Sequence, residues 1–198
     1  VPFRSVPHFA RFAPVPGPGH VVIVRPGETS RLLRLVPSDF WTEPLVTPAH
    51  PFAEVLDVEE FPTQEKLKAA LGDVSKLAYV GDDPIFAGAL DLPAEAIEPT
   101  VLLAALDWER AFKTPYEVEC LRQASRRAGA GHAAVRAGVG EGISERALHF
   151  RYLEATGHLE NETPYTNIIA WDAASAVLHY QSKCATAPEH GHSFLIDA

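Results

Sequence analysis

Residues 113–142 read KTPYEVECLRQASRRAGAGHAAVRAGVGEG, and the character of the chain changes at the start of this stretch. Thr114 can cap the exposed amides of a helix start, Pro115 suits the first helical position, and Glu117 completes a capping box. The glycines at 138–142 predict the end of the helix. We therefore expect one long helix here, at the beginning of a second domain.

A second helix is predicted directly after the first. Ser144 is a favourable N-cap, Glu145 is well placed near the positive end of the helix, and Gly157 follows the last turn. Two antiparallel helices result. Beyond them, three short apolar runs predict strands of a sheet that packs against these helices: residues 165–172, 176–180 and 193–198.

The part of the chain before residue 111 alternates strand and helix patterns. Residues 20–24 and 31–36 are apolar runs on either side of a proline-glycine turn, which predicts a hairpin. Proline and aromatic residues at 1–18 indicate an extended arm rather than a helix. The later predicted elements are a loop at 37–52, strands at 54–61 and 76–81, and helices at 63–73 and 100–110.

This order of elements favours an α/β fold. We expect an N-terminal α/β domain over residues 1–110, with a parallel or mixed sheet. Residues 111–198 are expected to begin a second domain of α+β type.

Composition narrows the class of protein. The 198 residues are 46% hydrophobic and carry a formal charge of -9 that is spread along the chain, which favours a soluble protein and disfavours nucleic acid or an anionic membrane as partner. No apolar run is long enough to span a bilayer or to form a signal peptide. Cys120 and Cys184 lie in different segments, which favours reduced thiols and a cytoplasmic protein over a disulfide framework.

Two features of the ends predict that the chain is a piece of a longer protein. It contains no methionine, which either removal of an initiator or a start within a longer protein would explain. The last predicted strand lies at the very end of the chain, and an unpaired edge strand there leaves backbone groups exposed.

Several segments together resemble one family. Residues 109–135 resemble the domain junction and first catalytic helix of the pita-bread metallopeptidases, and residues 142–157 are similar to the next helix of that fold. Residues 164–180, followed by 193–198, resemble the approach to the active site of bacterial Xaa-Pro dipeptidases (prolidases). Residues 37–44, PSDFWTEP, are similar to part of the N-terminal domain of those enzymes. The resemblance covers nearly the whole chain and implies a creatinase-like N-terminal domain.

The resemblance implies a metal site of which this chain contains only the first ligand. Family members hold two divalent ions, usually manganese, between two aspartates, one histidine and two glutamates. Asp197, at the end of the segment Leu195-Ile196-Asp197-Ala198, matches the first aspartate, although an aspartate after a strand is by itself more often a turn residue. The remaining ligands would lie beyond Ala198, so we expect no stably bound metal and no activity in this chain alone.

The resemblance also implies a substrate site. His179 matches a histidine that would hydrogen-bond the scissile carbonyl or the tetrahedral intermediate, whereas its apolar context is also typical of a histidine in a core. Tyr165 and Leu178 match positions that line the substrate pocket, with core packing as the alternative for both. The implied substrates are dipeptides with a C-terminal proline and, since the group includes organophosphorus acid anhydrolases, organophosphate esters.

Other motifs give weaker evidence of function. The pair His190 and His192 is expected in a solvated turn, and Cys184 near His179 lacks an orienting partner for a thiol protease. The glycines at 138–142 follow a predicted helix, whereas a phosphate-binding loop follows a strand. The alternative function is a non-catalytic binding or dimerisation module with the same fold. We expect a homodimer, with a companion C-terminal fragment as a further partner that would complete the fold.

Overall fold

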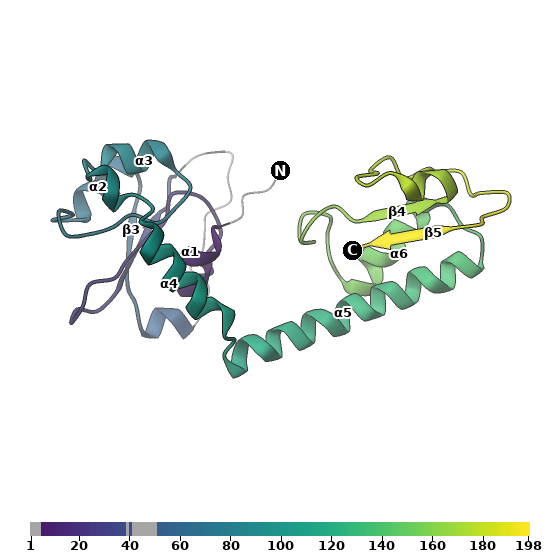
Figure 1. Ribbon diagram of the computed structural model, residues 1–198, viewed down its shortest axis with the longest axis horizontal. Coiled ribbons are helices and arrows are strands. Elements are labelled where there is room, and N and C mark those ends of the chain that lie inside the picture. Colours follow the sequence, from purple (N-terminus) through teal and green to yellow (C-terminus); the bar gives the residue numbers. More distant parts are fainter. Residues whose placement is uncertain (1–4, 39, 41–50) are drawn as a thin grey trace. The chain divides into compact units, whose positions relative to one another are not determined.

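The computed structural model describes residues 5–38, 40 and 51–198 of the chain (Figure 1). The chain divides into two compact units, Val1–Phe112 and Lys113–Ala198, and each is described by itself. The predicted loop at residues 37–52, which includes PSDFWTEP, lies mostly outside the described residues.

The first unit contains a mixed three-stranded sheet. Strand β1 (Val21–Ile23) pairs antiparallel with β2 (Arg31–Leu35), and β2 pairs parallel with β3 (Asp57–Phe61). The predicted hairpin is therefore confirmed. Its turn includes Gly27, whose φ of 81° lies in the left-handed region that glycine adopts without strain.

Both faces of β2 are covered. Leu32 and Leu33 are neighbours in a strand and therefore point to opposite faces, and both are fully buried. Leu33 belongs to a core cluster with Leu67 and Phe86 from two helices, whereas Leu32 packs with Val15 from the N-terminal segment. The helices of this unit are α1 (Pro7–Phe12), α2 (Gln64–Ala70), α3 (Pro84–Ala89) and α4 (Thr100–Ala111), with 3-10 turns η1 (Pro51–Glu54) and η2 (Ala94–Ala96).

Two predictions for this unit are wrong. The N-terminal segment is not wholly extended, because α1 begins at Pro7, a residue that suits the first turn of a helix. The predicted strand at 76–81 is reduced to a single bridge between Tyr79 and Ile97. Helix α3 begins soon after this bridge, where Asp83 caps it and accepts a hydrogen bond from the Phe86 amide at 2.8 Å.

The second unit begins with the predicted pair of helices, α5 (Pro115–Gly140) and α6 (Glu145–Thr156). Thr114 and Glu117 form the predicted capping box, which confirms the start of α5. Ser144 accepts a hydrogen bond from the amide of Ala147 and caps α6. Gly157 ends α6 in the left-handed conformation, with a φ of 68°.

The two helices pack closely and run antiparallel. A Cβ built on Gly131 would lie 2.5 Å from the ring of Tyr152 and 2.7 Å from Thr156, and one on Gly138 would lie 2.6 Å from Leu148. Later residues of α5 thus meet earlier residues of α6. The absence of a side chain at these glycines lets the helices approach each other.

A two-stranded antiparallel sheet packs on the helices α5 and α6 (Figure 1, green to yellow). It is formed by β4 (Ile168–Trp171) and β5 (Phe194–Asp197), and Ile169 joins Leu148 and Tyr152 in the core of the unit. The third strand predicted at 176–180 is wrong. The 3-10 turn η3 (Asp172–Ala176) and a further turn take its place, because residues 176–179 are exposed and make no ladder.

Two further observations concern the described residues. Cys120 and Cys184 are both free thiols. Among the helices that the structure describes, none has both the length and the apolar character needed to cross a bilayer.

Candidate functional site

Asp197 and Tyr165 meet at one end of the two-stranded sheet. Asp197 is the last residue of β5 and pairs with Ile168, the first residue of β4. Tyr165 lies three positions before Ile168, and its hydroxyl donates a hydrogen bond to Oδ1 of Asp197. Antiparallel pairing therefore brings together two predicted site residues that lie far apart in the sequence.

This contact leaves the Asp197 carboxylate accessible. Both side chains belong to exposed residues, and the hydrogen bond to Asp197 raises the pKa of Tyr165, with burial adding to it. The phenol therefore stays protonated and remains a donor at neutral pH. The remaining lone pairs of the carboxylate are available to another ligand.

Asp197 is the one residue of this pair whose side chain could serve as a ligand for a metal ion. Asp197 offers a hard oxygen that suits a divalent ion such as Mn²⁺ or Mg²⁺. In the part of the chain that the structure describes, no group of three or more His, Cys, Asp or Glu side chains could hold a metal ion. One carboxylate cannot hold such an ion tightly by itself, because these ions need several ligands.

Leu178 and His179 lie in the exposed turn after η3, not on a strand. Leu178 is 82% exposed and His179 is exposed as well, so neither is a core residue. Among the described residues, no hydrogen bond or ion pair joins His179 to Tyr165 or Asp197. The structure thus unites two of the predicted site residues and places the other two on a separate turn of the same unit.

Glu145 anchors that turn, a role that the sequence prediction missed. Glu145 is 3% exposed, and its carboxylate accepts hydrogen bonds from the Trp171 amide at 2.7 Å, the Tyr180 hydroxyl at 2.7 Å and the Cys184 amide at 2.6 Å. The bond to Glu145 is the main cause that raises the pKa of Tyr180. The only signal in the sequence was an acidic residue at a helix start, which many helices share.

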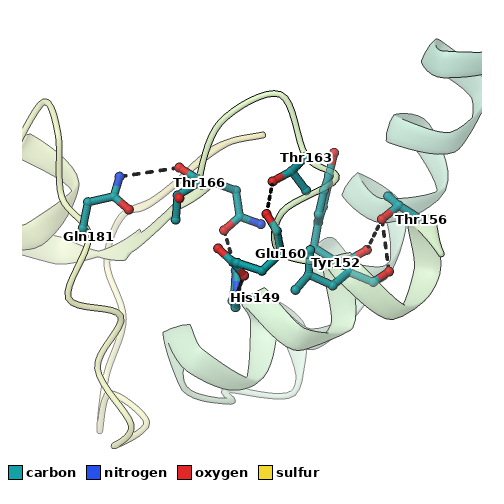
Figure 2. A network of polar contacts seen from close by, with 9 residues as sticks. His149, Tyr152, Thr156, Glu160, Thr163, Thr166 and Gln181 are labelled. Atoms are coloured by element: carbon teal, nitrogen blue, oxygen red, sulfur yellow. Dashed lines mark hydrogen bonds and ion pairs between the residues drawn. The ribbon is translucent and has the colours of Figure 1, made fainter. Parts of the chain in front are cut away.

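A partly buried polar network lies around His149 of α6 (Figure 2). The ring of His149 faces an oxygen at each nitrogen: Asn167 Oδ1 lies 2.5 Å from Nδ1, and Glu160 Oε2 lies 2.6 Å from Nε2. Lys183 is buried nearby; burial lowers its pKa, and the carboxylates of Glu160 and Glu145 oppose that effect. The contacts of His149 join α6 to the chain before β4.

A pocket of about 450 Å³ adjoins Tyr165. Its wall includes Cys120 and Arg127 from α5, Tyr152 from α6, and Asn167. Leu178 and His179 do not line it. Ala198, the residue that follows Asp197, also lines it.

Comparison with known proteins accounts for both units. Residues 1–108 match the family model of the Xaa-Pro dipeptidase N-terminal domain. Residues 119–198 match the model of metallopeptidase family M24. Asp197, Tyr165 and Glu145 all lie within the second match.

Curated relatives match along the whole chain. The Xaa-Pro dipeptidase of Cronobacter sakazakii is 36% identical, that of Pseudoalteromonas haloplanktis 37% and that of Pseudoalteromonas translucida 38%, each over 100% of this chain. The chain spans 45% of the length of each of these relatives. The first family model alone covers more than half of the chain. This chain therefore belongs to the Xaa-Pro dipeptidase family, and its second unit lies within metallopeptidase family M24.

Proposed function

We propose that the protein to which this chain belongs hydrolyses dipeptides with a C-terminal proline. The observation that carries the proposal is the contact between Tyr165 and Asp197 at the end of β5. It places an accessible carboxylate beside a protonated phenol within the segment that matches the metallopeptidase model. The names of the relatives support the substrate class.

In this proposal Asp197 is a metal ligand and Tyr165 orients it. A hydrogen bond that holds one carboxylate oxygen fixes the direction of the remaining lone pairs, which is the usual task of a residue behind a ligand. The divalent ions, when bound, would activate water and polarise the scissile carbonyl. Tyr165 also forms part of the pocket wall beside Asp197, where it would contact the dipeptide.

His179 and Leu178 are proposed to approach the substrate from the turn after η3. His179 would donate a hydrogen bond to the scissile carbonyl or to the tetrahedral intermediate. Leu178 would offer an apolar contact for a substrate side chain or for the proline ring. Their exposure in this unit is consistent with both roles, since neither side chain is used in the core.

Finer features of the proposal have their own tests. We propose manganese as the metal, a homodimer as the assembly, the cytoplasm as the location and a pita-bread fold for the complete second domain. Metal analysis of the purified full-length protein, light scattering and cell fractionation address the first three. Hydrolysis of an organophosphate ester by the same preparation tests the second substrate class.

The decisive experiment compares two neutralised carboxylates in the full-length protein. Release of proline from Ala-Pro in the presence of Mn²⁺ is measured for wild type, Asp197→Asn and Glu189→Gln. We expect Asp197→Asn to lose activity by at least about a hundredfold, because a neutral amide is a far weaker ligand than a carboxylate. Glu189 is exposed and takes part in no interaction described above, so Glu189→Gln should match wild type.

Undiminished hydrolysis by Asp197→Asn would contradict the metal role of Asp197. A full-length protein that cleaves Ala-Ala as well as Ala-Pro would contradict the proline specificity. If the full-length protein neither hydrolyses Ala-Pro nor retains metal, the non-catalytic binding module becomes the better explanation.

A further inference from the structure

The segment between β4 and β5 contains little regular structure. Between Trp171, the last residue of β4, and Cys184 the chain forms η3 and turns, and this stretch carries both Leu178 and His179. An exposed segment of this kind does not hold a side chain in place by core packing. Polar contacts at its ends must therefore decide where His179 lies.

We propose that Glu145 is a positioning residue for His179. The inference rests on the proposed function, in which His179 contacts the substrate. The carboxylate of Glu145 joins both ends of the segment, because it accepts from the amide of Trp171 on one side and from the amide of Cys184 on the other. The third donor is the hydroxyl of Tyr180, the residue next to His179.

Glu145 does not act as a cap for its own helix. Ser144 already accepts a hydrogen bond from the Ala147 amide at 3.2 Å. Within the described part of the chain, the three hydrogen bonds to the Glu145 carboxylate come from the segment and not from the first turn of α6. The Glu145 side chain therefore binds the segment that bears His179 and not the first turn of its own helix.

Neighbouring contacts hold the same segment in register. The Arg146 amide donates to the Cys184 carbonyl at 3.1 Å, so two successive residues of α6 bind the far end of the segment. Gln181 reaches the carbonyl of Thr166 at 3.5 Å (Figure 2). These bonds are peripheral, whereas the Glu145 carboxylate is buried and cannot exchange its protein donors for water without local opening.

The arrangement requires a carboxylate at position 145. An ionised carboxylate is an acceptor at both oxygens, which matches three converging donors. In Glu145→Gln the amide nitrogen would face N–H or O–H donors, so at least one buried contact becomes a donor facing a donor. The side chain keeps its size, and the change therefore removes the anchor without leaving a cavity.

The test uses the full-length protein and the variants Glu145→Gln, Tyr180→Phe and, as a matched control, Glu141→Gln. Glu141 also accepts two hydrogen bonds, but from Arg151 at the surface and away from the segment. We expect hydrogen exchange of the amides in 171–184 to accelerate in Glu145→Gln and, less, in Tyr180→Phe. We also expect kcat for Ala-Pro to fall by roughly ten- to a hundredfold in Glu145→Gln, with Glu141→Gln at the wild-type value in both measurements.

A double-mutant cycle with His179→Ala separates positioning from general stability. If Glu145 acts through His179, adding Glu145→Gln to His179→Ala should lower kcat by less than about twofold. Equal losses in both backgrounds would overturn the inference, as would unchanged exchange and unchanged kcat in both Glu145→Gln and Tyr180→Phe. Tyr180→Phe keeps the test decisive if Glu145→Gln does not fold.

Failure of this inference can be told apart from failure of the proposed function. If His179→Ala keeps wild-type activity, the role of His179 is wrong and the positioning role falls with it. If His179→Ala is impaired while Glu145→Gln is not, only the positioning role is overturned.

Discussion

Gly129 and Gly131 lie two residues apart on α5, and we predict that alanine is tolerated at position 129 and less well tolerated at position 131. Gly129 is exposed, and a Cβ there meets nothing within 4 Å. At Gly131 the same atom would lie 2.5 Å from Cε2 of Tyr152 and 2.7 Å from Cγ2 of Thr156. Of these two glycines, Gly131 is therefore the one that the contact between α5 and α6 needs.

The expected magnitudes follow from two competing effects. Alanine is favoured over glycine inside a helix by about 1 kcal/mol, and both variants gain this. Overpacking a buried contact costs roughly 1–3 kcal/mol, and only Gly131→Ala incurs it. We expect Gly129→Ala to be stabilised by up to about 1 kcal/mol and Gly131→Ala to be less stable than Gly129→Ala by roughly 1–3 kcal/mol.

The assay is urea denaturation, with hydrogen exchange of the α6 amides as a probe specific to the second unit. The midpoint and the exchange protection should both rise in Gly129→Ala relative to Gly131→Ala. Equal stability of the two variants, or greater stability of Gly131→Ala, would refute the close helix contact. Circular dichroism of each variant at neutral pH provides the control that both retain their helices.

Two further predictions concern the core of the second unit and a half-buried histidine of the first unit. Leu148→Ala should lower the free energy of unfolding by roughly 2–5 kcal/mol, because Leu148 is fully buried. Leu159 is exposed, so Leu159→Ala should change the free energy of unfolding by less than about 0.5 kcal/mol. Urea denaturation measures both values. His20 accepts from the Leu35 amide at Nδ1 and contacts the Pro16 carbonyl through Nε2, and burial lowers its pKa. Because the unfolded chain then binds the proton more readily, the stability contributed by His20 should be complete above the ordinary histidine pKa and be lost as pH falls through the lowered value. Denaturation between pH 8 and pH 5 should show this loss in wild type and a weaker one in His20→Asn; identical pH profiles would contradict the role of His20.

The family and the helical hairpin were predictable because their signals are local. Thr114, Pro115 and Glu117 act on amides of the same turn, so the start of α5 needs no distant partner. The same holds for Ser144 and Gly157 at the two ends of α6. Apolar runs predicted β2, β3, β4 and β5 for the same reason, since burial of one strand face leaves a mark in the sequence itself.

The wrong predictions fall where a contact with a distant residue determines the conformation of a segment. Residues 176–180 are apolar and read as a strand, yet Tyr180 is drawn to Glu145, a residue 35 positions earlier. Lys183 adopts a φ of 47° where the segment returns toward α6. No local pattern reports a buried carboxylate that gathers donors from another segment.

For the candidate site too, local signals were predictable from the sequence and long-range contacts were not. Asp197, Tyr165, Leu178 and His179 were named from sequence because each belongs to a contiguous motif. Their grouping was not, because strand pairing brings Tyr165 to Asp197 across 32 residues, and the segment that bears His179 is bound to Glu145 of α6. The sequence gives the identity of each residue. Hydrogen bonds between distant segments depend on how β4, β5 and α6 pack, and that packing exists only in the folded unit.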